Sequence, residues 1–168
     1  MVEGVFSTPL CGQREQVEVV LNEKLGENGV ENEGAMASKP GNVLFVCIHN
    51  AGRSQMAAAF LDALAHGRAV AGSAGTIPAE KVNPVVVEAM KEVGLDVSGN
   101  KPRLLTQEML EGVDRVITMG CSVEEACPLL FVPAEDWGLE DPAGKSIEVV
   151  RRIRDEIRER VLRLLDEL

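Results

Sequence analysis

The sequence is poor in aromatic residues and has no long apolar run. Aromatic residues make up 3% of its 168 positions, with four Phe, one Trp and no Tyr. A core formed by this chain must therefore be built from Val, Leu, Ile, Met and Ala. No apolar stretch approaches the roughly 20 residues that a membrane-spanning helix needs. The first residues lack the basic start and apolar segment of a secretory signal, so we expect a cytoplasmic protein that does not bind membranes.

Basic residues are scarce relative to acidic ones. Lys and Arg number 17 against 27 Asp and Glu, which gives a formal net charge of -10. Such a charge argues against nucleic acid or an anionic membrane as the main partner. It also means that an anionic substrate needs a strong local positive site, because the overall field repels it. The length and a hydrophobic content of 45% predict one folded domain, and we expect it to be a monomer.

Residues 1–41 differ in composition from the rest of the chain. Asn, Glu and Gly crowd the stretch from Asn22 to Gly34. This composition is typical of a poorly ordered extension. Met36 is an alternative start that would place most of the extension outside the protein. We therefore expect the folded catalytic domain to comprise residues 42–168.

After Asn42, apolar strands alternate with amphipathic helices. The expected strands are Val43–Val46, Ala69–Ala74, Asp114–Met119 and Leu129–Val132, and the expected helices are Arg53–His66, Asn83–Gly94, Thr106–Glu111 and Val150–Leu168. This alternation predicts an α/β domain with a parallel sheet covered on both faces. In such sheets ligands bind beyond the C-terminal ends of strands, where a loop leads into a helix. Cys47 lies at such a point.

The segment from Cys47 to Ser54 has the residues of an oxyanion-binding loop with a nucleophile at its start. Its backbone N–H groups are expected to point inward, at the positive end of the following helix; they belong to Ile48, His49, Asn50, Ala51, Gly52, Arg53 and Ser54. Gly52 and Asn50 tolerate the backbone angles that such a tight loop needs. The planar guanidinium of Arg53 can hold two oxygens of a tetrahedral oxyanion.

These features favour the thiolate form of Cys47, which is a nucleophile. Ser54 is placed to donate a hydrogen bond to the sulfur. His49 either tunes the loop or points into solvent. The alternative for Cys47 is a buried, unreactive thiol at the end of a strand. The loop alone does not separate arsenate from a phosphate ester.

Further segments along the chain share an order with a known family. They are Val43–Ala58, Ser73–Thr76, Met119–Cys121, Ala126–Pro128, Glu135–Trp137 and Asp141–Gly144. Together they resemble arsenate reductases built on the low-molecular-weight protein tyrosine phosphatase fold, from Val43 to the C-terminus. The resemblance implies a three-layer fold with a four-stranded parallel sheet flanked by helices. It also implies that Cys47 forms a covalent adduct with arsenate, that Arg53 and the loop amides bind the oxygens, and that Asp141 is a general acid.

A reductase must also dispose of two electrons, which a phosphatase need not do. A second thiolate attacks the adduct, so that arsenite leaves and a disulfide remains. The resemblance assigns this relay to Cys121 and Cys127; inert thiols are an alternative, and metal ligation is a poorer one for a C-x5-C pair without a nearby His. We expect no metal ion and no tightly bound cofactor. The reductant stays open between thioredoxin and a mycothiol- or glutaredoxin-type system, because Gly52 stands where thioredoxin-coupled members carry a cysteine.

Two other functions remain open. A low-molecular-weight protein tyrosine phosphatase would hydrolyse phosphate monoesters with Cys47, an acid and water. Such phosphatases line the rim of the site with aromatics, whereas this chain has no Tyr and Trp137 is its single Trp, for which core packing is an equal alternative. A non-catalytic oxyanion-binding module would not need Asp141 and the relay cysteines. Cys11, in the extension, is interpreted as an incidental thiol.

Overall fold

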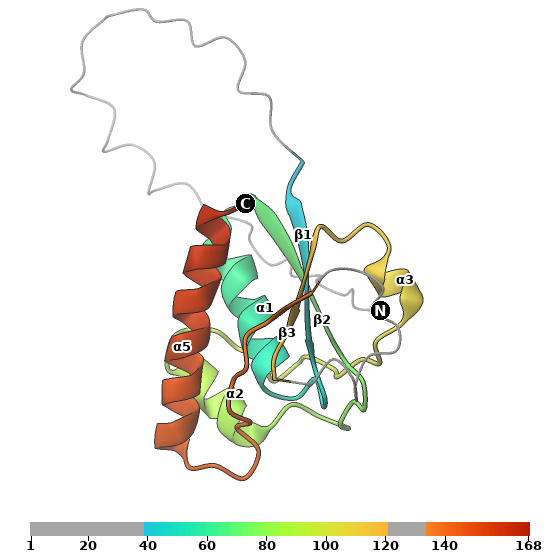
Figure 1. Cartoon of the computed structure of the whole chain (residues 1–168). Helices are drawn as coiled ribbons and strands as arrows, with labels where there is room; N and C mark the ends of the chain where they lie inside the picture. Colours follow the sequence, from blue (N-terminus) through green and yellow to red (C-terminus); the bar gives the residue numbers. More distant parts are fainter. Residues whose placement is uncertain (1–38, 121–133) are drawn as a thin grey trace, which may run out of the picture. The chain divides into compact units, whose positions relative to one another are not determined.

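The domain is built on a four-stranded parallel sheet with the strand order β2-β1-β3-β4. The computed structural model describes residues 39–120 and 134–168. The strands are β1 (Gly41–Cys47), β2 (Ala69–Gly75), β3 (Arg115–Thr118) and β4 (Ala134–Asp136), and all three pairings are parallel (Figure 1). The predicted α/β fold with a flanked four-stranded parallel sheet is confirmed.

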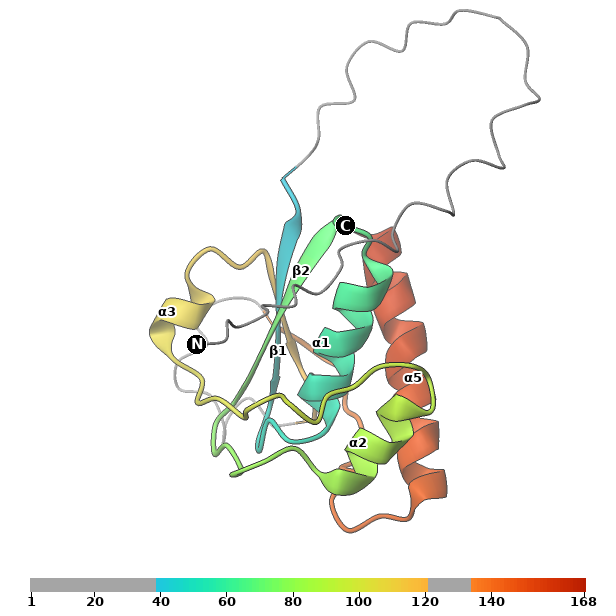
Figure 2. The ribbon, with the colours of Figure 1, turned by 180° about the vertical axis from the view of Figure 1, so that it is seen from behind.

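The helices lie on both faces of this sheet. Helices α1 (Arg53–Leu64), α2 (Pro84–Lys91) and α5 (Ile147–Asp166) lie on one face, and the short α3 (Gln107–Leu110) lies on the other, as Figures 1 and 2 show. Alternate residues of a strand face opposite sides of its sheet. Phe45 and Cys47 accordingly join the large core under α1 and α5, whereas Leu44 and Val46 join a smaller cluster with Leu110 of α3. The main core, and with it Cys47, lies on the side of α1.

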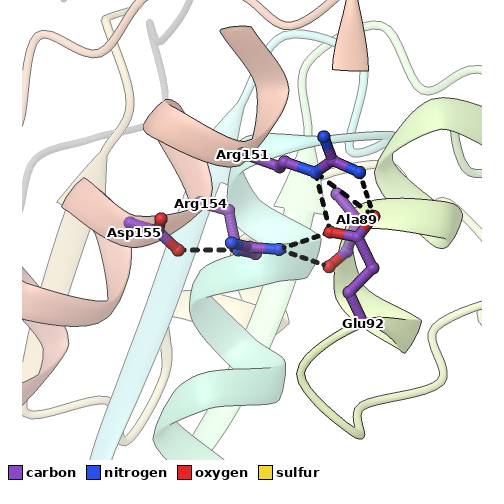
Figure 3. Close-up of polar contacts among 5 residues, drawn as sticks. All are labelled: Ala89, Glu92, Arg151, Arg154 and Asp155. Atoms are coloured by element: carbon purple, nitrogen blue, oxygen red, sulfur yellow. Dashed lines mark hydrogen bonds and ion pairs between the residues drawn. The ribbon is translucent and has the colours of Figure 1, made fainter. Parts of the chain in front are cut away.

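Charged side chains fasten the end of α2 to α5 (Figure 3). The buried Arg154 donates from Nη1 to the carbonyl of Ala89 at 2.8 Å and to Glu92 Oε2 at 3.0 Å. Arg151 binds the same carboxylate, with Nε 2.9 Å from Oε2 and Nη2 2.5 Å from Oε1. The hydrogen bond from Arg151 is the main reason that the pKa of Glu92 falls to about 2, with further lowering by the charge of Arg151 and by Arg154, against a smaller opposing effect of desolvation. These contacts fix the C-terminal end of α2.

The ends of several elements differ from the sequence prediction. Helix α1 ends at Leu64 rather than His66, because His66 and Gly67 adopt left-handed backbone angles, with φ of 48° and 82°. Helix α2 ends at Lys91, three residues before Gly94, whose φ is 80°. Helix α5 ends at Asp166, so the predicted extension to Leu168 is wrong.

Two predictions fall wholly or mostly outside the described residues. The fourth strand was expected at Leu129–Val132, whereas β4 is a polar strand of three exposed residues, Ala134–Asp136, which no apolar pattern marks. The predicted extension 1–41 overlaps the described part only at its end, where β1 begins at Gly41. No helix in the described part of the chain has the length and apolar character that crossing a bilayer requires.

Candidate active site

The segment that carries Cys47, which we call the cysteine loop (residues 47–54), joins the end of β1 to the start of α1. Strand register places Cys47 beside Gly75, the last residue of β2. A Cβ atom at Gly75 would lie 2.6 Å from the carbonyl oxygen of Ile48 and 2.8 Å from the nitrogen of Asn50. A side chain at Gly75 would therefore displace the loop. Cys47 itself is buried, with 2% of its surface exposed.

The carbonyl groups of the cysteine loop are bonded on the outside of the loop. Four of these carbonyls accept from backbone amides of the segment 76–83, at 2.8–3.3 Å. The pairs are Thr76 to Cys47, Ile77 to Ile48, Ala79 to His49, and Asn83 to Ala51. The carbonyl of Asn50 accepts from Gln55 Nε2 at 3.0 Å, and that of Gly52 accepts from the N–H of Met56 at 3.0 Å. Residues 76–83, between β2 and α2, thus hold the loop from one side.

This arrangement turns the loop N–H groups inward. In a trans peptide the C=O and the following N–H point in opposite directions, and the described chain has no cis peptide bonds. The amides of residues 48–53 are therefore directed toward the loop interior. The N–H of Asn50 shows this directly, because it donates to Cys47 Sγ at 3.2 Å. The φ of Asn50 is 48°, in the left-handed region that the sequence predicted it to tolerate.

The side chain of Asn50 orients the hydroxyl group beside the sulfur. Its Oδ1 accepts from the backbone N–H of Arg103 at 2.8 Å and from Gln55 Nε2 at 3.2 Å, which identifies the oxygen end of the amide. Its Nδ2 then donates to Ser54 Oγ at 2.9 Å. Ser54 Oγ lies 2.9 Å from Cys47 Sγ. With that oxygen already accepting from Asn50, the Ser54 hydroxyl is placed to donate its proton to Cys47 Sγ.

Arg53 is buried and clamped by backbone carbonyls. Its Nη1 donates to the carbonyl of Met119 at 2.6 Å and to that of Leu139 at 2.9 Å. Its Nη2 donates to Asp141 Oδ2 at 2.9 Å, in an ion pair whose side chains are 5% and 41% exposed. The two hydrogen bonds at Nη1 fix the plane of the guanidinium group. The other two nitrogens of the group, Nη2 and Nε, lie in the same plane.

Asp136 and Trp137 support the edge of the site without lining it. Asp136 Oδ1 accepts from the Thr118 hydroxyl at 2.9 Å and from the Gly120 N–H at 2.7 Å. Partial burial works to raise the pKa of Asp136, but the hydrogen bonds from Gly120, Thr118 and Gly138 and the charge of Arg53 outweigh it and lower the pKa. Trp137 is buried against Phe45, with ring centroids 5.7 Å apart, so it packs in the core and does not form an aromatic rim.

A pocket of about 270 Å³ opens at the cysteine loop. Cys47, Arg53 and Asp141 line it, together with His49, Lys81 and the small or aliphatic residues Ala51, Gly52, Ala79, Val82, Pro142 and Ala143, with Asn83 and Pro84. The fold thus brings Asp141 to the cysteine loop, 88 residues along the chain from Arg53. His49 is exposed at the rim rather than built into the loop interior.

Not every predicted site residue can be placed, and some contributors were missed. Cys121 and Cys127 lie outside the described residues. The sequence did not indicate residues 76–83 or Gln55, whose contacts shape the loop. Residues 76–83 contact the loop through backbone amides, which every residue type except Pro has, so no sequence pattern marks these residues. Lys81 was detectable as a basic residue in an acidic chain, but nothing placed it at the pocket.

Comparisons with known proteins agree with this geometry. The family model for low molecular weight phosphotyrosine protein phosphatases matches residues 42–168. A Halobacterium salinarum relative, provisionally named an arsenate reductase, is 45% identical over 128 residues, or 73% of this chain and 89% of that protein. The thioredoxin-dependent arsenate reductase of Corynebacterium glutamicum is similar in structure, with a TM-score of 0.65 and 38% identity over 80% of this chain and 65% of that one.

A phosphatase is similar to a comparable degree. The YwlE arginine phosphatase from Geobacillus stearothermophilus matches with a TM-score of 0.68 and 28% identity, over 76% of this chain and 92% of that one. The family match covers residues 42–168, which include both the cysteine loop and Asp141. This chain belongs to the low molecular weight phosphotyrosine protein phosphatase family.

Proposed function

We propose that this chain reduces arsenate to arsenite, the activity for which its Halobacterium and Corynebacterium relatives are named. The observation that carries the proposal is the cysteine loop, whose carbonyls are all bonded to neighbouring groups and whose Asn50 N–H donates to Cys47 Sγ, because this arrangement suits a tetrahedral oxyanion held against a nucleophile. The pocket is small, at about 270 Å³, and none of the described side chains that line it belongs to a Phe, Tyr or Trp. Such a pocket suits an inorganic oxyanion better than an aryl ester.

In the first step, Cys47 Sγ attacks arsenic, a sulfur–arsenic bond forms and an arsenic–oxygen bond breaks. The Ser54 hydroxyl, 2.9 Å from the sulfur, stabilises the thiolate before the attack. The loop amides and Arg53 hold the remaining oxygens. Asp141, which lies beside Nη2 of Arg53, acts in its protonated form and gives its proton to the departing hydroxyl group, which leaves as water.

In the second step, a second thiolate attacks Cys47 Sγ. A sulfur–sulfur bond forms, the sulfur–arsenic bond breaks and its electron pair stays on arsenic, which leaves as arsenite. We assign this attack to Cys121 and the following exchange to Cys127, which pairs with Cys121 and frees Cys47. Sequence alone supports these two assignments. Thioredoxin, or a low-molecular-weight thiol such as mycothiol, then returns two electrons to the disulfide.

Phosphate monoester hydrolysis is the second candidate, because the first step needs the same groups. Asp141 lies 2.9 Å from Arg53 at the pocket, where a general acid for a phosphate ester would also lie. The likeness to an arginine phosphatase supports this candidate too. In a hydrolase, water would attack the phosphorylated Cys47, and no further cysteine would be needed.

Arsenate turnover, measured side by side with thioredoxin and with small thiols, tests the proposal. We expect arsenite formation with at least one reductant and a loss of at least about 10³-fold in Cys47→Ser. Cys11→Ser is the matched control and should turn over as the wild type does. Brisk aryl-phosphate hydrolysis without arsenate turnover would reject the reductase in favour of the phosphatase. Arsenate binding without either activity would favour a non-catalytic module.

The relay is tested by one equivalent of arsenate added without reductant. We expect mass spectrometry to find a disulfide between Cys121 and Cys127. Free thiols at both positions after one turnover would reject the internal relay and favour direct attack by an external thiol.

A further inference from the structure

We propose that Lys81 selects doubly charged oxyanions at the mouth of the pocket. The proposal deepens the proposed function, on which it rests for the identity of the substrate. Its electrostatic part depends only on the geometry of the pocket, so it can be tested separately. Lys81 would act on approach and binding, and not on the bond changes at Cys47.

The backbone on either side of Lys81 is tied to the cysteine loop. The N–H of Ala79, two residues before Lys81, donates to the carbonyl of His49 at 2.9 Å. The N–H of Asn83, two residues after Lys81, donates to the carbonyl of Ala51 at 2.9 Å. These two bonds keep the backbone at Lys81 beside the loop. The side chain is exposed and lines the same pocket as Cys47 and Asp141. A flexible ammonium group is therefore tethered at the pocket mouth.

The charge of Lys81 is not compensated by an ion pair within the described part of the chain. The other guanidinium or ammonium group of the pocket, Arg53, has Asp141 Oδ2 at 2.9 Å, and this pair presents little net charge to an approaching anion. The whole chain carries a formal charge of -10 and repels anions. The attraction at the mouth must come from the lining itself, where Lys81 and His49 are the remaining basic residues.

A cation in this position discriminates by charge. Its Coulomb attraction for a dianion is twice that for a monoanion at the same distance. Arsenate and phosphate change from monoanion to dianion around neutral pH and are mainly dianions above it, whereas phosphodiesters, perchlorate and nitrate carry one charge. Because Lys81 is exposed, salt should screen the effect over a Debye length of about 10 Å at 0.1 M.

The kinetic test compares Lys81→Gln with Lys101→Gln, which makes the same change in net charge at an exposed lysine outside this pocket. We expect kcat/KM for arsenate to fall about 3- to 10-fold in Lys81→Gln at low ionic strength, with kcat unchanged. The loss should shrink as salt is raised. Lys81→Arg should keep the wild-type value. Equal losses in the two Gln variants would assign the effect to net charge and overturn the proposal.

The second test does not require arsenate turnover. Cys47 is alkylated with iodoacetate, an anion, and with iodoacetamide, its neutral counterpart, and labelling of the Cys47 peptide is followed by mass spectrometry. We expect Lys81→Gln to slow iodoacetate about 3-fold relative to iodoacetamide. We also expect arsenate to protect Cys47 less well in this variant, whereas protection by the monoanion perchlorate changes less.

The two tests separate the two proposals. An unchanged iodoacetate-to-iodoacetamide ratio in Lys81→Gln would overturn the role of Lys81, whatever the enzyme does with arsenate. A shifted ratio in a protein that turns over no arsenate would leave the role of Lys81 intact and reject the reductase.

Discussion

The two sides of the pocket are held in different ways. Most of the cysteine loop is buried, with His49 exposed, and every carbonyl from residue 47 to 52 accepts a hydrogen bond from a backbone N–H or from Gln55. On the other side, the side chain of Asp141 is 41% exposed and is held by its ion pair with Arg53 and by the N–H of Ala143, at 2.9 Å each. The proposed nucleophile and the loop around it are thus held by many contacts, whereas the proposed acid is partly exposed and has fewer contacts.

Replacing Asn50 by Ala should break the fixed side and give the largest effect. The change removes the acceptor for Arg103 N–H, the donor to Ser54, and a residue that tolerates a φ of 48°. We expect a loss of about 2–4 kcal/mol in the free energy of unfolding, measured in urea. Arsenate turnover should fall about 10³-fold, since the loop N–H groups lose their alignment.

Asn50→Gly sharpens this test, because glycine accepts the left-handed angle but not the hydrogen bonds. It should recover part of the lost stability and little of the activity. Full activity in either variant would show that the cradle does not depend on Asn50.

Replacing Asp141 by Asn should affect the adjustable side, with a smaller loss. Asn keeps the shape of the side chain but cannot supply the proton, so we expect turnover to fall about 10²-fold. Stability should change by less than about 1 kcal/mol, because the ion pair is partly exposed. Thermal unfolding and turnover measured on the same sample check both parts. A stability loss as large as that of Asn50→Ala would contradict the comparison.

Replacing Glu92 by Gln should have the smallest effect, a small loss of stability near neutral pH that disappears as the pH falls toward 2. The segment 76–83 leads into α2, whose end is fastened by Glu92 to Arg151 and Arg154. The pKa of Glu92 is lowered to about 2 from the ordinary 4.5, so its contribution to stability is present above pH 4.5 and is lost as the pH falls toward 2. As the pH falls through this window, the free energy of unfolding should therefore decrease less in the variant than in the wild type. Turnover at neutral pH should be unchanged.

Melting temperatures measured at steps from pH 6 to about 2 check this prediction. Glu111→Gln is the matched control, because Glu111 is exposed and forms no ion pair in the described ranges. Above pH 4.5 Glu92→Gln should melt at a lower temperature than Glu111→Gln, and the two melting temperatures should converge as the pH falls toward 2. Identical acid profiles would show that the Glu92 contacts do not stabilise the fold in solution.

The sequence predicted the parts of the fold and site that depend on residue type. The apolar run in β1 predicted that strand, and the amphipathic period of α5 predicted that helix. Cys47, Asn50 and Arg53 predicted the oxyanion-binding loop. Asp141 was found only through the family resemblance, since an Asp-Pro pair alone is an ordinary turn signal. The clamp on Arg53 and the amides of residues 76–83 were not predictable, because their backbone groups are common to all residue types. Strand β4 was missed because it is short, polar and exposed.

The clamp on Arg53 has a consequence for how the site comes into being during synthesis. Its partners Met119, Leu139 and Asp141 follow it by 66, 86 and 88 residues. While the chain emerges from the ribosome, Cys47 and Arg53 are therefore present long before the groups that orient the guanidinium. Domains fold largely as units, so a nascent or truncated chain that stops before residue 139 should carry a cysteine without a working oxyanion site. If Cys47 has the role proposed above, its thiol should react with oxyanions only after residues 119–141 have been synthesised and have folded against Arg53.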